Sequence, residues 1–146
     1  MKVTQSSRWA ATWTGTRLID GKGIDGRWSS QGCAATSDAY RPHNLVDGME
    51  FFSLELEAPQ KIAKVQIANR VDCCFYRGNN IRITVGPSPV YDPEEPLCLP
   101  EITQLSKSAG LQDYVCDGDV QGKFVKISRP GHINLCEVKV FTEEGK

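Results

Sequence analysis

The chain has 146 residues, a formal net charge of −1 at pH 7, 40% hydrophobic residues and 24% charged residues. This length suits one domain with its own hydrophobic core, and no apolar run is long enough to cross a bilayer, so membrane insertion is not expected. A net charge near zero offers no basic surface for a polyanion, so nucleic acid is not an expected partner.

Short strands separated by turns are predicted along the first half of the chain. Residues 4–19 are rich in Trp, Thr and Gly and predict strand and turn, and residues 28–47 predict a long irregular loop. A strand at 51–56 is followed by a predicted turn at Pro59-Gln60 and by a second apolar strand at 62–68.

The clearest alternation follows this second strand. Ile81, Ile83 and Val85 alternate with polar residues and predict a strand with one buried face. Most prolines fall within residues 87–100, which excludes a helix there and predicts an extended surface loop.

Three more strands are predicted toward the C-terminus, over residues 111–116, 124–128 and 135–142. In the last of them the register stays open, because Leu135 and Val138 differ in parity although both are apolar. Many short strands with turn residues between them predict an all-β sandwich.

Six cysteines in a chain of this size are informative. An even number suggests a disulfide framework, and disulfides persist in oxidising compartments, so we expect a secreted or extracellular protein; a cytosolic protein with free thiols is the alternative. The first seven residues contain no apolar segment typical of a signal peptide. We interpret residues 1–146 as a single mature domain, with residues 1–3 and 143–146 as added ends or linkers.

The stretch from Asn69 to Arg77 carries the residues best suited to binding. Arg70, Asp72 and Arg77 lie between two predicted strands, where loops present binding residues on a rigid scaffold. A guanidinium stays charged and offers five donors in a fixed plane, which suits a ligand that presents only oxygens. Asp72 can orient one guanidinium through a bidentate pair. The alternative is a solvated ion cluster on the surface.

Cys73 and Cys74 lie in the same stretch. Bonded to each other, they form a rigid ring that fixes the turn and presents a flat sulfur surface, although their Cα atoms, about 3.8 Å apart, are closer than in most disulfides. Alternatively, each pairs with a distant cysteine. His43, 27 residues before Arg70, can donate and accept hydrogen bonds at once, which suits a hydroxyl group; the alternative is an ordinary surface histidine.

In these residues and their spacing the chain resembles the F-type lectins, the fucose-binding family of eel agglutinin. The family pattern is a histidine and, after a spacer, Arg-X-Asp followed by four residues and Arg or Lys. The corresponding residues here are His43, Arg70-Val71-Asp72 and Arg77, with the two adjacent cysteines inside the pattern. The resemblance covers nearly the whole chain.

The resemblance implies a jelly-roll-like β-sandwich of the discoidin or galactose-binding-domain type, whose loops at one end form a shallow sugar pocket. It implies that His43, Arg70 and Arg77 hydrogen-bond a fucose and that Asp72 orients an arginine. The apolar floor beneath the methyl group of the sugar is implied at Cys73, Cys74, Trp28 and Trp9.

The resemblance also implies a structural calcium ion and two further disulfides, Cys33–Cys136 and Cys98–Cys116. Calcium takes a set of carboxylate and carbonyl oxygens. The implied ligands are the side chains of Asp20 and Glu137 and, by backbone carbonyl or position, Arg17, Lys22, Gly32 and Cys136.

The chain departs from the family pattern at three places. Phe51-Phe52 stands where the family usually has two tryptophans, and Gly32 stands where it often has a serine that helps to hold the metal. The loop between Cys33 and Phe51 is also longer than in the eel protein. Counted from the arginines, the family histidine corresponds to His43; counted from Cys33, it corresponds to Ala35, and we favour His43.

We therefore predict a secreted, non-catalytic carbohydrate-binding lectin domain that recognises terminal L-fucose, for cell-surface, immune or gamete recognition. One shallow site binds weakly, so we expect homo-oligomers or tandem repeats to supply avidity for fucosylated glycans or glycoproteins. The main alternative is an adhesion module that binds a protein or membrane partner through the same loop end. A redox enzyme that uses Cys73-Cys74 and a carbohydrate-binding accessory of a glycosidase are further alternatives.

Overall fold

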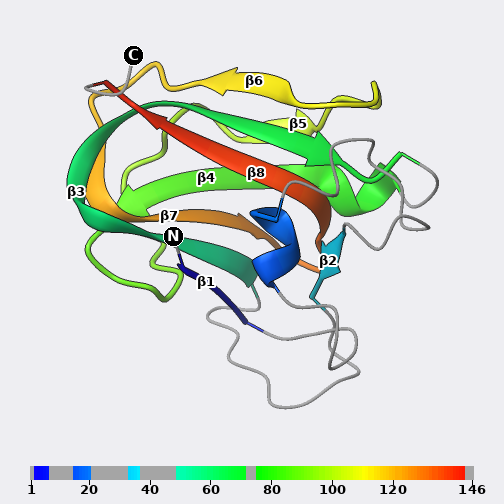
Figure 1. Cartoon of the computed structure of the whole chain (residues 1–146), viewed down its shortest axis with the longest axis horizontal. Coiled ribbons are helices and arrows are strands. Elements are labelled where there is room, and N and C mark those ends of the chain that lie inside the picture. The colour runs from blue at the N-terminus through cyan, green and yellow to red at the C-terminus, as the bar shows by residue number, and fades with distance from the viewer. Residues whose placement is uncertain (1, 7–14, 21–32, 37–48, 72–74, 144–146) are drawn as a thin grey trace.

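The computed structural model describes residues 2–6, 15–20, 33–36, 49–71 and 75–143 (Figure 1). Within these ranges the regular elements are strands, apart from two short 3-10 turns, η1 (Gly15–Leu18) and η3 (Phe75–Gly78). The strands are β1 (Lys2–Gln5), β2 (Ala34–Ala35), β3 (Glu50–Asn69), β4 (Asn79–Gly86), β5 (Ile102–Gln104), β6 (Gln112–Val115), β7 (Gln121–Arg129) and β8 (Asn134–Thr142).

Strand β3 passes through both layers of the molecule. Its first part pairs with β1 and β7 and its second part with β6 and β8, and Figure 1 shows the bend between them. The predicted turn at Pro59-Gln60 is therefore wrong, because the strand continues through these residues. Pro59 lies between Glu55 and Gln60, where the pairing with β7 shifts register, so its missing N–H does not interrupt the paired segments.

The two layers enclose one hydrophobic core. The first has the order β1-β3-β7-β4-β5 and the second the order β2-β8-β3-β6, and every pairing is antiparallel. Ile81, Ile83 and Val85 of β4 are fully buried in this core, which confirms the predicted alternation. The expectation of an all-β sandwich is likewise confirmed.

A bulge in β8 resolves the open register of the last strand. Ala68 pairs with Glu137, but the next residue of β3, Asn69, pairs with Leu135, so Cys136 is an extra residue on β8. The bulge moves Leu135 onto the same face as Val138, and both are buried in the core. This bulge explains why Leu135 and Val138, an odd and an even position, face the same core.

The N-terminal residues take part in the sheet. Lys2 and Val3, which the sequence analysis assigns to an added end, pair with Glu55 and Leu54 of β3. Gln5 then donates from Nε2 to the carbonyl of Ala35, 3.2 Å away, and so connects β1 to β2.

The proline-rich segment 87–100 is an extended loop, as predicted, and it is held to the sheet by a buried lysine. Lys126 of β7 is fully buried; its ammonium donates to the carbonyls of Ser88 and Val90 and pairs with the carboxylate of Glu95. No local pattern in the sequence indicates this buried ion pair. None of the described segments is a helix with the length and apolar character of a membrane span.

Candidate functional site

The two arginines of the sequence pattern lie at the same end of the sandwich. Arg70 directly follows β3, and Arg77 lies in η3, immediately before β4, at the right-hand end of Figure 1. Both side chains are half-buried. The other predicted binding residues lie outside the described residues, namely His43, Asp72, Cys73, Cys74, Trp9 and Trp28.

The side chain of Arg77 is held by an asparagine from a distant strand. Its Nη1 donates to Oδ1 of Asn134 at 2.6 Å. Asn134 is the first residue of β8 and is only 1% exposed. Asn134 is not predictable from the sequence, because a lone asparagine just before the strand predicted at 135–142 carries no signal of its own.

The backbone of Arg70 is held by its neighbour. Oδ1 of Asn69 accepts from the N–H of Arg70 at 2.9 Å, and Asn69 is 4% exposed. A Cβ at Gly78 would lie 2.9 Å from Nδ2 of Asn69, so a larger residue at the end of η3 would force the asparagine to shift. Asn69 therefore contacts the backbone next to both arginines.

A third arginine fixes the turn that leads into Asn134. Arg129 donates from Nε to the carbonyl of Asn79 at 2.8 Å and from Nη1 to the carbonyl of His132. Nδ1 of His132 lies 3.2 Å from the carbonyl oxygen of Thr36. These contacts link the start of β4, the turn after β7 and the segment after β2. The sequence analysis gave no role to Arg129 or His132.

The disulfide Cys33–Cys136 braces the same end, as the resemblance implied. It connects residues 103 positions apart and joins β8 to the residue that precedes β2. In the adjoining ladder Ala35 pairs with Asn134. The position that matches the family histidine when counted from Cys33 is thus a buried alanine beside the partner of Arg77. The second implied disulfide, Cys98–Cys116, is also present.

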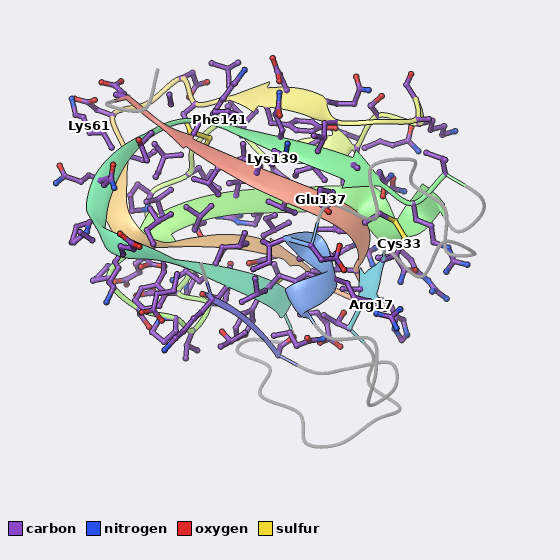
Figure 2. All side chains as sticks on the ribbon, in the orientation of Figure 1. Arg17, Cys33, Lys61, Glu137, Lys139 and Phe141 are labelled. Atoms are coloured by element: carbon purple, nitrogen blue, oxygen red, sulfur yellow. A yellow bond between two sulfur atoms is a disulfide. The ribbon has the colours of Figure 1, made fainter. Side chains whose placement is uncertain are left out.

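The implied calcium ligands are described only in part. Glu137 is a carboxylate buried on β8, and Asp20 is exposed after η1, whereas Lys22 and Gly32 lie outside the described residues. The guanidinium of Arg17 donates to the carbonyl of Cys33 at 3.4 Å, and Figure 2 shows both residues toward the arginine end of the molecule. Among the described residues no group of three or more His, Cys, Asp or Glu is arranged to hold a metal. The described donors fit calcium in type, but they are fewer than the six to eight oxygens it takes.

A hollow of about 550 Å³, which we call the far groove, lies at the opposite end, near the bend of β3. It is lined by Ile62, Ala63, Lys64, Val115, Cys116, Gly118, Phe141, Thr142 and Glu143.

Lys64 of the far groove contacts polar and aromatic side chains in and beside the groove. The ammonium of Lys64 lies 4.9 Å from the ring centre of Phe141 and 3.3 Å from Oδ2 of Asp113. Gln66 donates to the same carboxylate at 2.7 Å, and these contacts lower the pKa of Asp113 below its ordinary value. We place the candidate site at the arginine end because that end gathers the charged donors of the sequence pattern.

Among known proteins, no family model matches the chain. Fucolectin-6 of Anguilla japonica is 27% identical over 145 residues, which cover 95% of this chain and 71% of that protein. The crystal structure of an F-lectin (fucolectin) from striped bass (Morone saxatilis) serum is 26% identical, with a TM-score of 0.78. The match covers 97% of this chain, which spans only 46% of the striped bass chain.

A third similar structure comes from a bacterium. The fucose-binding module SpX-3 of Streptococcus pneumoniae has a TM-score of 0.71 at 22% identity, over 97% of this chain and 93% of the module, and it supports the fold alone. Taken together, the sequence similarity to Fucolectin-6 and the structural similarity to the striped bass fucolectin confirm that this chain resembles the F-type lectins, as its arginine pattern predicts.

Proposed function

We propose that this chain is a non-catalytic carbohydrate-binding domain that recognises terminal L-fucose on glycans. One observation carries the proposal: Arg70 and Arg77, the two arginines of the family pattern, lie together at one end of the sandwich in a chain similar to fucolectins. The similar proteins are lectins and binding modules, which supports a non-catalytic role. The comparisons give no support to the alternative of an adhesion module for a protein or membrane.

The chemistry of the arginines suits an uncharged sugar. Hydroxyl and ring oxygens accept hydrogen bonds, and a guanidinium presents several N–H donors in a fixed plane. Arg77 is held through Nη1 by Asn134, so the orientation of its plane is set by the protein. Hydrogen bonds that involve a charged donor are stronger than neutral ones, and they identify the ligand by the positions of its oxygens.

The remaining roles in the pocket rest on the family pattern. His43 exchanges hydrogen bonds with a hydroxyl, Asp72 orients an arginine, and the ring Cys73–Cys74 forms the apolar floor together with Trp28 and Trp9. A sugar site of this kind combines directional donors with one apolar surface.

Calcium, secretion and avidity complete the proposal. Asp20 and Glu137 would hold a structural calcium ion with the carbonyls of Arg17, Lys22, Gly32 and Cys136. Two disulfides support an oxidising, extracellular setting. Because a single shallow site binds weakly, oligomers or tandem copies would supply useful affinity for fucosylated glycoproteins.

A glycan array with the purified domain tests the proposal. We expect fucosylated glycans among the hits and elution from fucose resin by free L-fucose; an array with no fucosylated hit contradicts the proposal. The same array and thermal melts are repeated with calcium and with chelator. If calcium is bound, the chelator lowers the Tm, whereas an unchanged Tm removes calcium from the proposal and leaves the sugar site standing.

A further inference from the structure

Two buried asparagines lie side by side at the arginine end, and we call Asn69 and Asn134 the asparagine pair. Asn69 is the last residue of β3 and pairs across the ladder with Leu135, the residue that follows Asn134 on β8. The two residues are 65 positions apart in sequence, yet the bulge at Cys136 sets them next to each other. Their exposed fractions are 4% and 1%.

Each member of the pair contacts one arginine of the site through its amide oxygen. Oδ1 of Asn69 accepts from the N–H of Arg70, and Oδ1 of Asn134 accepts from Nη1 of Arg77. Both donors are N–H groups without any acceptor capacity, so the amide oxygen, and not the amide nitrogen, must face each arginine. The orientation of both amides is therefore fixed by chemistry.

The fold alone does not explain asparagines at these two positions. Within the described residues, Nδ2 of each is buried without a hydrogen-bond partner. A buried donor that lacks a partner destabilises a protein, and an apolar residue of similar shape avoids this loss. The oxygen of each amide, in contrast, accepts a hydrogen bond from an arginine.

A neutral amide is also the partner that best preserves a binding arginine. A carboxylate at position 134 would hold Arg77 in a bidentate ion pair and oppose its charge. The amide oxygen of Asn134 occupies one N–H through Nη1 and carries no net charge. The guanidinium is thus oriented at little cost to its charge.

The surroundings make the pair rigid. Asn134 lies opposite Ala35 in the short β2–β8 ladder, two residues before the disulfide-bonded Cys136. Asn69 packs against Gly78, where a Cβ would come within 2.9 Å of its Nδ2. We propose that the asparagine pair prepares the arginine end for the ligand before it binds: Asn134 positions the guanidinium of Arg77, and Asn69 fixes the backbone from which Arg70 extends, so that less ordering is needed on binding. This inference rests on the proposed sugar-binding function.

Substitution of Asn134 tests the inference on the intact domain. Asn134→Leu keeps the size and removes the acceptor, and we expect fucose affinity to fall about tenfold, a change that corresponds to about 1.4 kcal/mol. Asn134→Asp restores an acceptor oxygen but opposes the charge of Arg77, so its affinity is expected to lie between those of Asn134→Leu and wild type. Thr84→Val is the matched control. Like the two amide nitrogens, the hydroxyl of Thr84 is buried without a partner among the described residues, but it lies in β4 away from Arg70 and Arg77, so its loss should leave fucose affinity unchanged.

Coupling to Arg77 separates positioning from a general structural effect. In the Arg77→Lys background the fork geometry is lost, so Asn134→Leu should cause less than about a twofold further change. An equal loss in both backgrounds overturns the inference, as does wild-type affinity in Asn134→Leu.

A measurement without ligand keeps the inference independent of the proposed function. In the ligand-free wild type, the guanidinium resonances of Arg77, assigned by their loss in Arg77→Lys, should show slow rotation of the held Nη group, and Asn134→Leu should make it fast. Fast rotation in wild type overturns the inference even if Asn134→Leu does not fold. Slow rotation in a protein that binds no fucosylated glycan sinks the proposed function and leaves the positioning role in place.

Discussion

The two ends of the sandwich hold their charged side chains in different ways. At the arginine end, Arg77 donates to an amide oxygen, and Arg129 donates to two backbone carbonyls. At the end with the far groove, Lys64 contacts the carboxylate of Asp113, and Lys61 contacts that of Asp119 at 2.8 Å. Figure 2 shows Lys61 and Phe141 on this side, opposite Arg17 and Cys33.

The way in which each end holds its charged side chains is more informative about function than the volume of the far groove. In exposed ion pairs such as those of Lys61 and Lys64, each ammonium already has a carboxylate partner, and the pair adds little to stability. A hydrogen bond to an amide or carbonyl oxygen orients a guanidinium and adds no opposing charge of its own. The far groove offers about 550 Å³ of space, but the ammonium of Lys64 already contacts the carboxylate of Asp113 and the ring of Phe141. The arginine end, which holds both arginines of the sequence pattern, is therefore the better candidate for ligand binding.

The largest expected effect compares the disulfides of the two ends. Loss of a disulfide costs more when the closed loop is longer, with about 4.7 kcal/mol for a loop of about 100 residues and about 3 kcal/mol for one of about 15. The separations here are 103 residues for Cys33–Cys136 and 18 for Cys98–Cys116. In urea titrations, we expect replacement of Cys33 and Cys136 by serine to lower the free energy of unfolding more than replacement of Cys98 and Cys116. Equal losses, or a larger loss for the second pair, contradict the entropic comparison.

The next largest effect is expected on fucose affinity, when the arginines of one end are compared with Lys64 of the other. Arg77→Ala or Arg70→Ala removes charged donors that are proposed to contact the sugar, and such bonds contribute about 1.5–3 kcal/mol each, or about 10- to 150-fold in affinity. Lys64→Ala at the far groove should change fucose affinity by less than about twofold. Calorimetry or retention on fucose resin measures both, with circular dichroism as a control for folding. A folded arginine variant that still elutes with free fucose removes the arginine from the site.

The smallest effect concerns Asp113 at the far groove. The hydrogen bond from Gln66 and the contact with Lys64 lower the pKa of its carboxyl group in the folded state. Because the folded-state pKa is depressed, this stabilisation is present above the unfolded-state value of about 3.9 and is lost as pH falls through the folded-state pKa. Asp113→Asn should therefore lower the Tm slightly at neutral pH, with a difference that narrows in acid. Melts across this pH range test the sign, and a difference that widens in acid contradicts it.

The sequence predicted those features of the fold that depend on local patterns. The alternation of Ile81, Ile83 and Val85 marks β4, because one face of a strand repeats every second residue. The path through Pro59 was predicted wrongly, because proline favours turns locally and only the break in pairing with β7 makes it acceptable within β3. The register of β8 was left open, because its bulge appears only when Asn69 is matched with Leu135.

The candidate site was predictable to the extent that it follows one short motif. Arg70 and Arg77 were singled out by spacing and by resemblance, and both lie at one end of the sandwich. Asn134 could not be found in this way, because its partner Arg77 lies 57 residues earlier and only the folded chain places η3 beside the start of β8. The roles of His43, Asp72 and the adjacent cysteines stay predictions.

The course of β3 also governs when this domain can fold. The strand pairs with β1 near the beginning of the chain and with β7 and β8 near its end. Few of its contacts are local, and domains dominated by such non-local pairings fold in milliseconds to seconds. During synthesis β3 must wait, with unpaired edges, until residues 121–142 have emerged. The same strand that unites the two layers is therefore the segment most dependent on protection before the chain is complete.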